Sequence, residues 1–227
     1  MAKSSGNGET KTSKSAVKRK SASRKKKAVK KLSRAKKPAE MSLEQWQTEL
    51  RRQFGVDQEF DWKNVGDHPF FSEYEVHNPA SGKTYPVRVR GTESGDNFCG
   101  CADFATNTLG TCKHLEFVLA RLRRKRGAKK AFQAGFQQPY SEIHLHYGAQ
   151  RAVRFRPGSE CPRKVARLTA KYFDSQGELT PEGFASFEVL LSEAAKTGHE
   201  TRCYEDVLMF VAENRDAKQR AERLKKA

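Results

Sequence analysis

The amino-acid sequence predicts an α+β fold: a small ββα unit with flanking helices and a second β-hairpin, preceded by a disordered basic tail. Apolar residues alternate with a period of two in two segments and recur with helical spacing in the others. Positive charge gathers at the N-terminus, within a formal net charge of +17 over 227 residues. The expected parts are the tail over residues 1–40, the ββα domain over 41–130 and the hairpin with its helical region over 139–227.

The N-terminal forty residues differ in composition from the rest. They hold fifteen Lys or Arg and two Glu, so +13 of the net charge lies here and +4 elsewhere. With almost no large apolar side chain, this segment cannot offset the entropy cost of ordering. Its composition is similar to that of linker-histone tails. Binding to nucleic-acid phosphates is the functional interpretation, and a merely solubilising or localising tail is the alternative.

A helix and a hairpin are expected next. Ser42 and Gln45 form a capping-box pattern, which predicts a helix from Leu43 to Gln53. From Phe70 the apolar period changes to two, and a turn at 78–82 separates two alternating segments. This pattern is typical of a β-hairpin.

Four side chains with affinity for soft metals follow the hairpin as two close pairs. Cys99 and Cys101 are separated by one residue, and after ten more residues Cys112 and His114 are again separated by one. Thiolate sulfur and imidazole nitrogen are the donors that tetrahedral zinc prefers. Apolar residues from Leu115 to Leu122 then have helical spacing, so the second pair is expected in the first turn of a helix. The ββα unit is therefore predicted to hold one structural Zn²⁺.

Three other interpretations of these four residues are weaker. Simple core packing fits poorly, because Gly100, Asp103 and Asn107 make the segment polar. A disulfide is disfavoured by the odd total of five cysteines and by the lack of a signal peptide. A catalytic zinc would need an open coordination position, which four protein ligands do not leave.

The pattern C-x-C-x10-C-x-H ahead of a helix resembles the SWIM zinc finger, over about Phe70 to Arg126. This resemblance implies zinc held by Cys99, Cys101, Cys112 and His114, with DNA or protein as the bound partner. A finger of this type followed by a hairpin and helices is similar to the N-terminal region of bacterial Swi/Snf-type DNA-dependent ATPases. The phosphate-binding pattern G-x-x-x-x-G-K-[ST] is not present in this sequence, so their ATPase activity is not carried over.

Two groups of cations are candidate nucleic-acid contacts. The first puts seven positive charges into ten residues after the finger helix: Arg121, Arg123, Arg124, Lys125, Arg126, Lys129 and Lys130. The second lies on the predicted second hairpin: Arg151, Arg154 and Arg156. For the first group, the alternative is a solvated helix end whose cations favour the helix dipole.

The second half is expected to contain a hairpin and then helices. Residues 142–147 and 151–156 alternate around Gly148, and His144 and His146 are expected on an exposed polar face of this hairpin. Helices are predicted from Pro162, from Thr180 to Lys196, and from Cys203 or Tyr204 onward.

These features predict a zinc-containing binding protein rather than an enzyme, with nucleic acid, most readily DNA, as its partner. The alternative is a fragment of a Swi/Snf-type ATPase whose finger contacts a protein partner or its own motor. No apolar stretch is long enough for a membrane span, and no secretory signal is visible. The expected location is cytoplasmic, at the nucleoid in a bacterium or in the nucleus of a eukaryote.

Overall fold

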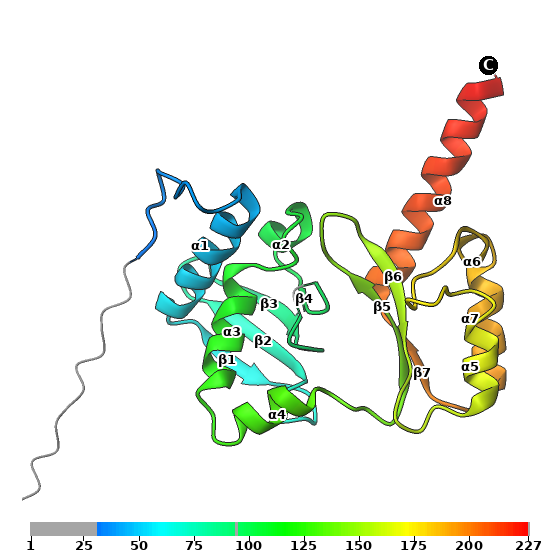
Figure 1. Ribbon diagram of the computed structural model, residues 1–227, viewed down its shortest axis with the longest axis horizontal. Helices are drawn as coiled ribbons and strands as arrows, with labels where there is room; N and C mark the ends of the chain where they lie inside the picture. The colour runs from blue at the N-terminus through cyan, green and yellow to red at the C-terminus, as the bar shows by residue number, and fades with distance from the viewer. Residues whose placement is uncertain (1–30, 94, 227) are drawn as a thin grey trace, which may run out of the picture. The chain divides into compact units, whose positions relative to one another are not determined.

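A computed structural model of the chain describes residues 31–93 and 95–226 (Figure 1). The contacts group Leu32–Ala227 into one unit. The tail expected over residues 1–40 lies largely outside the described residues. The last part of the tail, from residue 31, is described. Leu32 N–H donates to Gln53 Oε1 at 2.8 Å, and Arg34 lies over the Phe54 ring. This end of the predicted tail therefore packs on the first helix.

The helices and strands occur in a mixed order, which confirms the α+β class. The helices are α1 Leu43–Asp57, α2 Ala102–Thr106, α3 Lys113–Arg123, α4 Ala128–Ala134, α5 Arg163–Thr169, α6 Pro181–Ala185, α7 Phe187–Lys196 and α8 Glu205–Lys226. The strands are β1 Asp61–Asn64, β2 Glu73–Asn78, β3 Lys83–Arg88, β4 Phe98–Cys99, β5 Ser141–His146, β6 Ala152–Arg156 and β7 Thr201–Cys203. In the described part of the chain, no helix combines the length and apolarity needed to cross a membrane.

The first sheet is antiparallel with the strand order β1-β2-β3-β4. The predicted hairpin is confirmed as β2 and β3, with Val76 opposite Tyr85. Strand β1 pairs with β2 at one edge and was not predicted, because its four residues carry almost no apolar alternation. At the other edge, β4 is short and places Cys99 opposite Val87.

Helix α3 is enclosed by its neighbours. Seven of its eleven residues are buried, and it packs closely against α1. The two helices approach at Gly55, where a Cβ would lie 2.7 Å from the Lys113 carbonyl oxygen. The buried Glu116 carboxylate accepts hydrogen bonds from Thr111 and from Arg52 of α1. The predicted capping box at Ser42 is confirmed, and α1 extends four residues beyond the predicted end at Gln53.

The second sheet has the order β6-β5-β7. The predicted hairpin is confirmed as β5 and β6, but β7 adds to β5 in parallel from much later in the chain. Strand β5 is therefore central, and His144 is only 2% exposed. The prediction that His144 lies on an exposed face is wrong. The alternation of polar and apolar residues along this segment does not reveal that both sides of the strand are covered.

The C-terminal helices largely follow the sequence pattern. Thr180 caps α6 through the Gly183 N–H, with Pro181 in the first turn. The single helix expected to Lys196 is instead broken at Ser186 into α6 and α7. The last helix, α8, begins at Glu205, since Thr201–Cys203 forms β7.

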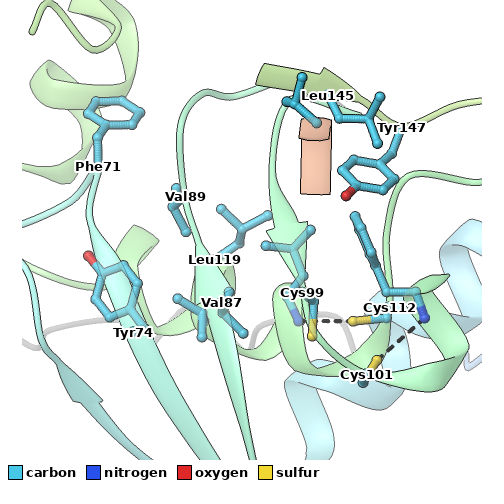
Figure 2. Close-up of a cluster of buried hydrophobic side chains, with 14 of the residues drawn as sticks. Phe71, Tyr74, Val87, Val89, Cys99, Cys101, Cys112, Leu119, Leu145 and Tyr147 are labelled. Carbon is cyan, nitrogen blue, oxygen red and sulfur yellow. Dashed lines mark hydrogen bonds between the residues drawn. The ribbon is translucent and has the colours of Figure 1, made fainter. Parts of the chain in front are cut away.

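Aromatic and backbone contacts join the two sheets. The rings of Phe104 in α2 and Tyr147 after β5 have centroids 4.6 Å apart. The Tyr147 N–H donates to the Gly95 carbonyl oxygen at 2.8 Å, and a Cβ on Gly110 would meet the Tyr147 carbonyl at 2.4 Å. Figure 2 shows Tyr147 in the same buried cluster as Cys99 of β4.

Candidate metal centre

Four predicted ligands come together at the edge of the first sheet. Cys99 ends β4, Cys101 is the N-cap of α2, Cys112 is the N-cap of α3 and His114 lies in the first turn of α3. All four are buried, and their ligand atoms lie within 4.8 Å of one another. Figure 2 shows the three sulfur atoms turned toward a common centre. The predicted ligand set is thus assembled from a strand and two helix starts.

The local backbone explains how two cysteines separated by one residue can share a site. Gly100 N–H donates to the Pro86 carbonyl oxygen at 2.9 Å, which holds this turn against β3. A Cβ on Gly100 would lie 2.9 Å from Pro86 Cγ, so the turn leaves little room for a larger residue. The glycine between the cysteines therefore lets both sulfurs point inward.

Backbone donors supplement the sulfur cluster. Phe104 N–H donates to Cys101 Sγ at 3.4 Å, and Leu115 N–H donates to Cys112 Sγ at 3.5 Å. Each donor is the third residue after its cysteine, the usual geometry of an N-cap. Such N–H groups stabilise negative charge on sulfur.

The thiols perturb one another strongly. Hydrogen bonds from Cys112 and Cys99 hold the pKa of Cys101 far below its usual range. The hydrogen bond with Cys101 raises the pKa of Cys99, and burial raises the pKa of Cys112. By themselves the three thiols thus favour one negative charge. A divalent cation at their centre would stabilise three thiolates, because its charge offsets their repulsion.

Aromatic rings surround the histidine. The His114 ring lies 4.6 Å from the Tyr85 ring and 5.0 Å from the Phe60 ring, between centroids. His114 Nδ1 is 4.0 Å from Cys99 Sγ, and Nε2 is buried without a hydrogen-bond partner among the described residues. An imidazole without an oxygen or nitrogen partner in a buried site is well suited to a metal ligand.

The residues fit one metal ion. Sulfur atoms around a tetrahedral zinc are about 3.8 Å apart, given a Zn–S distance of about 2.3 Å, and the observed cluster is close to this size. All five cysteines are free, so no disulfide competes for these sulfurs. The cluster can therefore hold one metal ion through three sulfurs and one nitrogen.

The first group of candidate nucleic-acid contacts lies from the end of α3 into α4. Arg121 is half-buried, with its guanidinium donating to the Gln58 carbonyl at 3.1 Å and lying over the Phe117 ring. The other members are exposed: Arg123, Arg124, Lys125, Arg126, Lys129 and Lys130. We call residues 121–130 the basic segment. Within the part of the chain that the structure describes, none of these six forms an ion pair with an acidic side chain.

The arginines of the second hairpin are placed differently. Arg154 pairs with Glu178 at 2.6 Å, and Arg156 pairs with Asp96 at 2.8 Å. Arg151 is exposed and donates to the Ala105 carbonyl. Two of these three charges are therefore already partnered within the protein, unlike those of the basic segment.

Sequence reasoning missed the groups that support the cluster. The N–H donor of Phe104 and the rings of Phe60 and Tyr85 had no part in the prediction, whereas the Leu115 donor lies at the helix start expected beside Cys112. The Phe104 donor had a signal in the sequence, since Cys101 precedes a short helical stretch by the offset of a cap. The rings had none, because Phe60 and Tyr85 reach His114 from distant segments.

Comparisons with known proteins add no relative: no family model matches the chain, and neither does any curated protein or solved structure.

Proposed function

We propose that this protein is a zinc-stabilised nucleic-acid-binding module of the SWIM type, with DNA as its partner. The buried cluster of Cys99, Cys101, Cys112 and His114 carries the proposal. It anchors the start of α3, and the basic segment follows directly from the end of the same helix. The metal would thus fix the helix that presents the cations.

Zinc is the metal that suits these donors. Three thiolates and one imidazole in a tetrahedral arrangement are typical of structural zinc sites, whereas Mg²⁺ and Ca²⁺ prefer oxygen ligands. When bound, zinc would supply folding free energy by linking β4 to α3. For comparable sites, this contribution is on the order of 10 kcal/mol.

The ligand set favours binding over catalysis. Four protein side chains complete a tetrahedral site, and a catalytic zinc keeps one position for water or substrate. The sulfur cluster is also buried, with Cys99 at 1% and Cys112 at 0% exposure. We therefore assign the metal a structural role.

The charge distribution supports nucleic acid as the partner. Six exposed cations of the basic segment have no acidic partner among the described residues. Cations that are not neutralised within the protein can replace the counterions of a phosphate backbone, which favours association. The charged N-terminal residues would add to this attraction without requiring a fixed structure.

Metal analysis tests the structural half of the proposal. Purified wild-type protein is expected to contain one zinc per chain, and Cys112→Ser is expected to lose it along with the fold of the finger. Cys161→Ser is the matched control, because Cys161 is outside the cluster and only half-buried. Less than one zinc per chain after mild preparation would contradict the assignment.

A salt titration tests the nucleic-acid half. DNA affinity is expected to fall with salt, with a log-log slope of about −0.9 for each phosphate contact. Replacing Arg123, Arg124 and Arg126 with Gln is expected to make this slope shallower by up to about three contacts. The control replaces three exposed cations of α5, Arg163, Lys164 and Arg167, with Gln. A flat salt response in both the full chain and a variant lacking residues 1–38 would exclude DNA.

A second candidate is a fragment of a Swi/Snf-type ATPase, in which the finger would bind a protein partner or its own motor. A hollow beside Cys99 favours it, since its lining includes Phe98, Phe210 and the 58%-exposed Met209. Exposed apolar side chains of this kind are common at protein interfaces. A reading frame that continues beyond Ala227 into a G-x-x-x-x-G-K-[ST] motif would support this relation.

A further inference from the structure

Helix α3 is not available as a recognition helix. Helix-based readers of duplex DNA insert an exposed helix face into the major groove. In this protein seven of the eleven α3 residues are buried, and α1 packs against it at Gly55. The helix that follows, α4, has only seven residues, and its N-cap Gly127 is in the left-handed conformation. The cations therefore lie around a helix end and a turn instead of along a helix that could enter a groove.

An aromatic ring lies directly beside these cations. Trp62 belongs to β1, an edge strand of the first sheet, and it is partly exposed. The Lys125 ammonium is 4.9 Å from the Trp62 ring centroid. Other contacts hold the ring in place, since the Tyr74 and Phe117 rings lie at centroid distances of 5.5 and 6.2 Å. The indole is thus fixed by the core and covered by one exposed, flexible lysine.

The surface next to Trp62 is hollowed. Its lining comprises Asp61, Trp62, Lys63, Glu75, His77 and Thr84. The Glu75 carboxylate is already paired with Lys63 at 2.8 Å, which leaves Asp61 as the acidic group of the lining without an ion pair to a described residue. Because this hollow offers no unpaired cation, phosphates are better accommodated by the neighbouring basic segment than inside it.

We infer that the basic segment and Trp62 together bind single-stranded nucleic acid, with one unpaired base stacked on Trp62 and the backbone phosphates on the exposed cations. This inference rests on the proposed function and specifies its substrate class. A base would replace the Lys125 ammonium over the indole, and Lys125 would move to a phosphate. Stacking of bases on aromatic rings beside a basic track is how proteins bind single strands without reading a sequence.

Tryptophan fluorescence provides a direct measurement, because the chain contains only Trp46 and Trp62. In the zinc-loaded full chain carrying Trp46→Phe, Trp62 is the sole tryptophan. Oligothymidylate is expected to quench its fluorescence in a saturable manner, and a duplex of the same length is not. Equal fluorescence changes with single strand and duplex, or no change on confirmed binding, would overturn the inference.

Affinity measurements separate the inference from the proposed function. Trp62→Ala is expected to weaken oligothymidylate binding about tenfold and leave duplex binding unchanged, whereas Trp62→Phe retains most of the affinity. Zinc content and circular dichroism verify that each variant is folded. If Trp62→Ala does not fold, the fluorescence test with Trp46→Phe remains decisive. If single-stranded and duplex DNA both bind and replacing Trp62 does not change either affinity, the inference fails and the proposed function stands. If neither single-stranded nor duplex DNA binds the zinc-loaded wild type, the inference and the proposed function both fail.

Discussion

Arg156 and Glu142 form an ion pair at 3.1 Å in which the carboxylate is only 1% exposed. The same guanidinium reaches Asp96 at 2.8 Å and the Arg90 carbonyl at 3.0 Å, both on the segment that follows β3. The second Glu142 oxygen accepts from the Tyr204 hydroxyl at 2.8 Å. Arg156 therefore connects the second sheet to the first through groups that have little access to water.

Replacing Arg156 is expected to destabilise the protein strongly. Arg156→Met would leave the buried Glu142 carboxylate without its cation, which costs about 3 kcal/mol in comparable sites. Urea unfolding measures the loss. The control is Lys63→Ala, which removes an exposed ion pair with Glu75 and should cost less than about 1 kcal/mol. Equal effects of the two substitutions would show that Glu142 does not depend on Arg156.

The contact between α1 and α3 leads to a second prediction. In Gly55→Ala, the new Cβ would lie 2.7 Å from both the Lys113 carbonyl oxygen and the Phe117 nitrogen, so the helices must separate. We expect a loss of about 2 kcal/mol in unfolding free energy, despite the better helix propensity of alanine. Gly148→Ala is the control, because its nearest atom is at an ordinary 3.7 Å and its φ is not positive. A more stable Gly55→Ala protein would contradict this packing.

His144 should make stability depend on pH. Burial, and then the charges of Arg156 and Arg90, lower the pKa of His144 to about 2. Between this value and the unfolded pKa of about 6.5, the unfolded chain binds a proton that the folded chain does not. Stability contributed by the neutral imidazole is therefore complete above pH about 6.5 and falls by about 1.4 kcal/mol per pH unit below it.

The variant His144→Leu isolates this contribution. Neither imidazole nitrogen has a hydrogen-bond partner among the described residues, so an apolar side chain of similar size should be tolerated. The free energy of unfolding, measured with denaturant from pH 7 to 5, should fall less steeply with decreasing pH for the variant than for the wild type. The half-buried His77 serves as the control in His77→Leu. Parallel pH profiles for wild type and His144→Leu would refute the assignment.

The turn between the first two cysteines gives a prediction for metal affinity. Gly100→Ala would press its Cβ against Pro86 Cγ and displace Cys99 relative to Cys101. Because a small displacement of ligands weakens a metal site, we expect zinc affinity to fall about 10–100-fold. Competition with a chromophoric chelator measures this. Gly82→Ala is a useful comparison. Its Cβ meets no atom within 4 Å, and the backbone strain caused by the positive φ at this position lies far from the cluster. Unchanged zinc affinity in Gly100→Ala would rule out this role of the turn.

The sequence predicted the features that depend on short segments. The cluster of Cys99, Cys101, Cys112 and His114 needed only two pairs of ligands and a following helix, and the structure brings all four together. The cap at Ser42 was also predicted, since it involves a side chain and a backbone N–H three residues away. Interactions of this range are visible in the order of the residues.

The features that the sequence analysis missed depend on segments that are far apart. The sequence around His144 does not show that β7 will cover the open side of β5, so its burial could not be inferred from alternation. The same limit applies to Arg154 and Arg156, whose partners Glu178 and Asp96 lie on other segments. By itself the sequence determined the clustered side chains Cys99, Cys101, Cys112 and His114 and the helix cap at Ser42, because each depends on residues close together along the chain. Tertiary structure decided which charges are buried in pairs and which remain exposed, because burial depends on the packing of the whole chain.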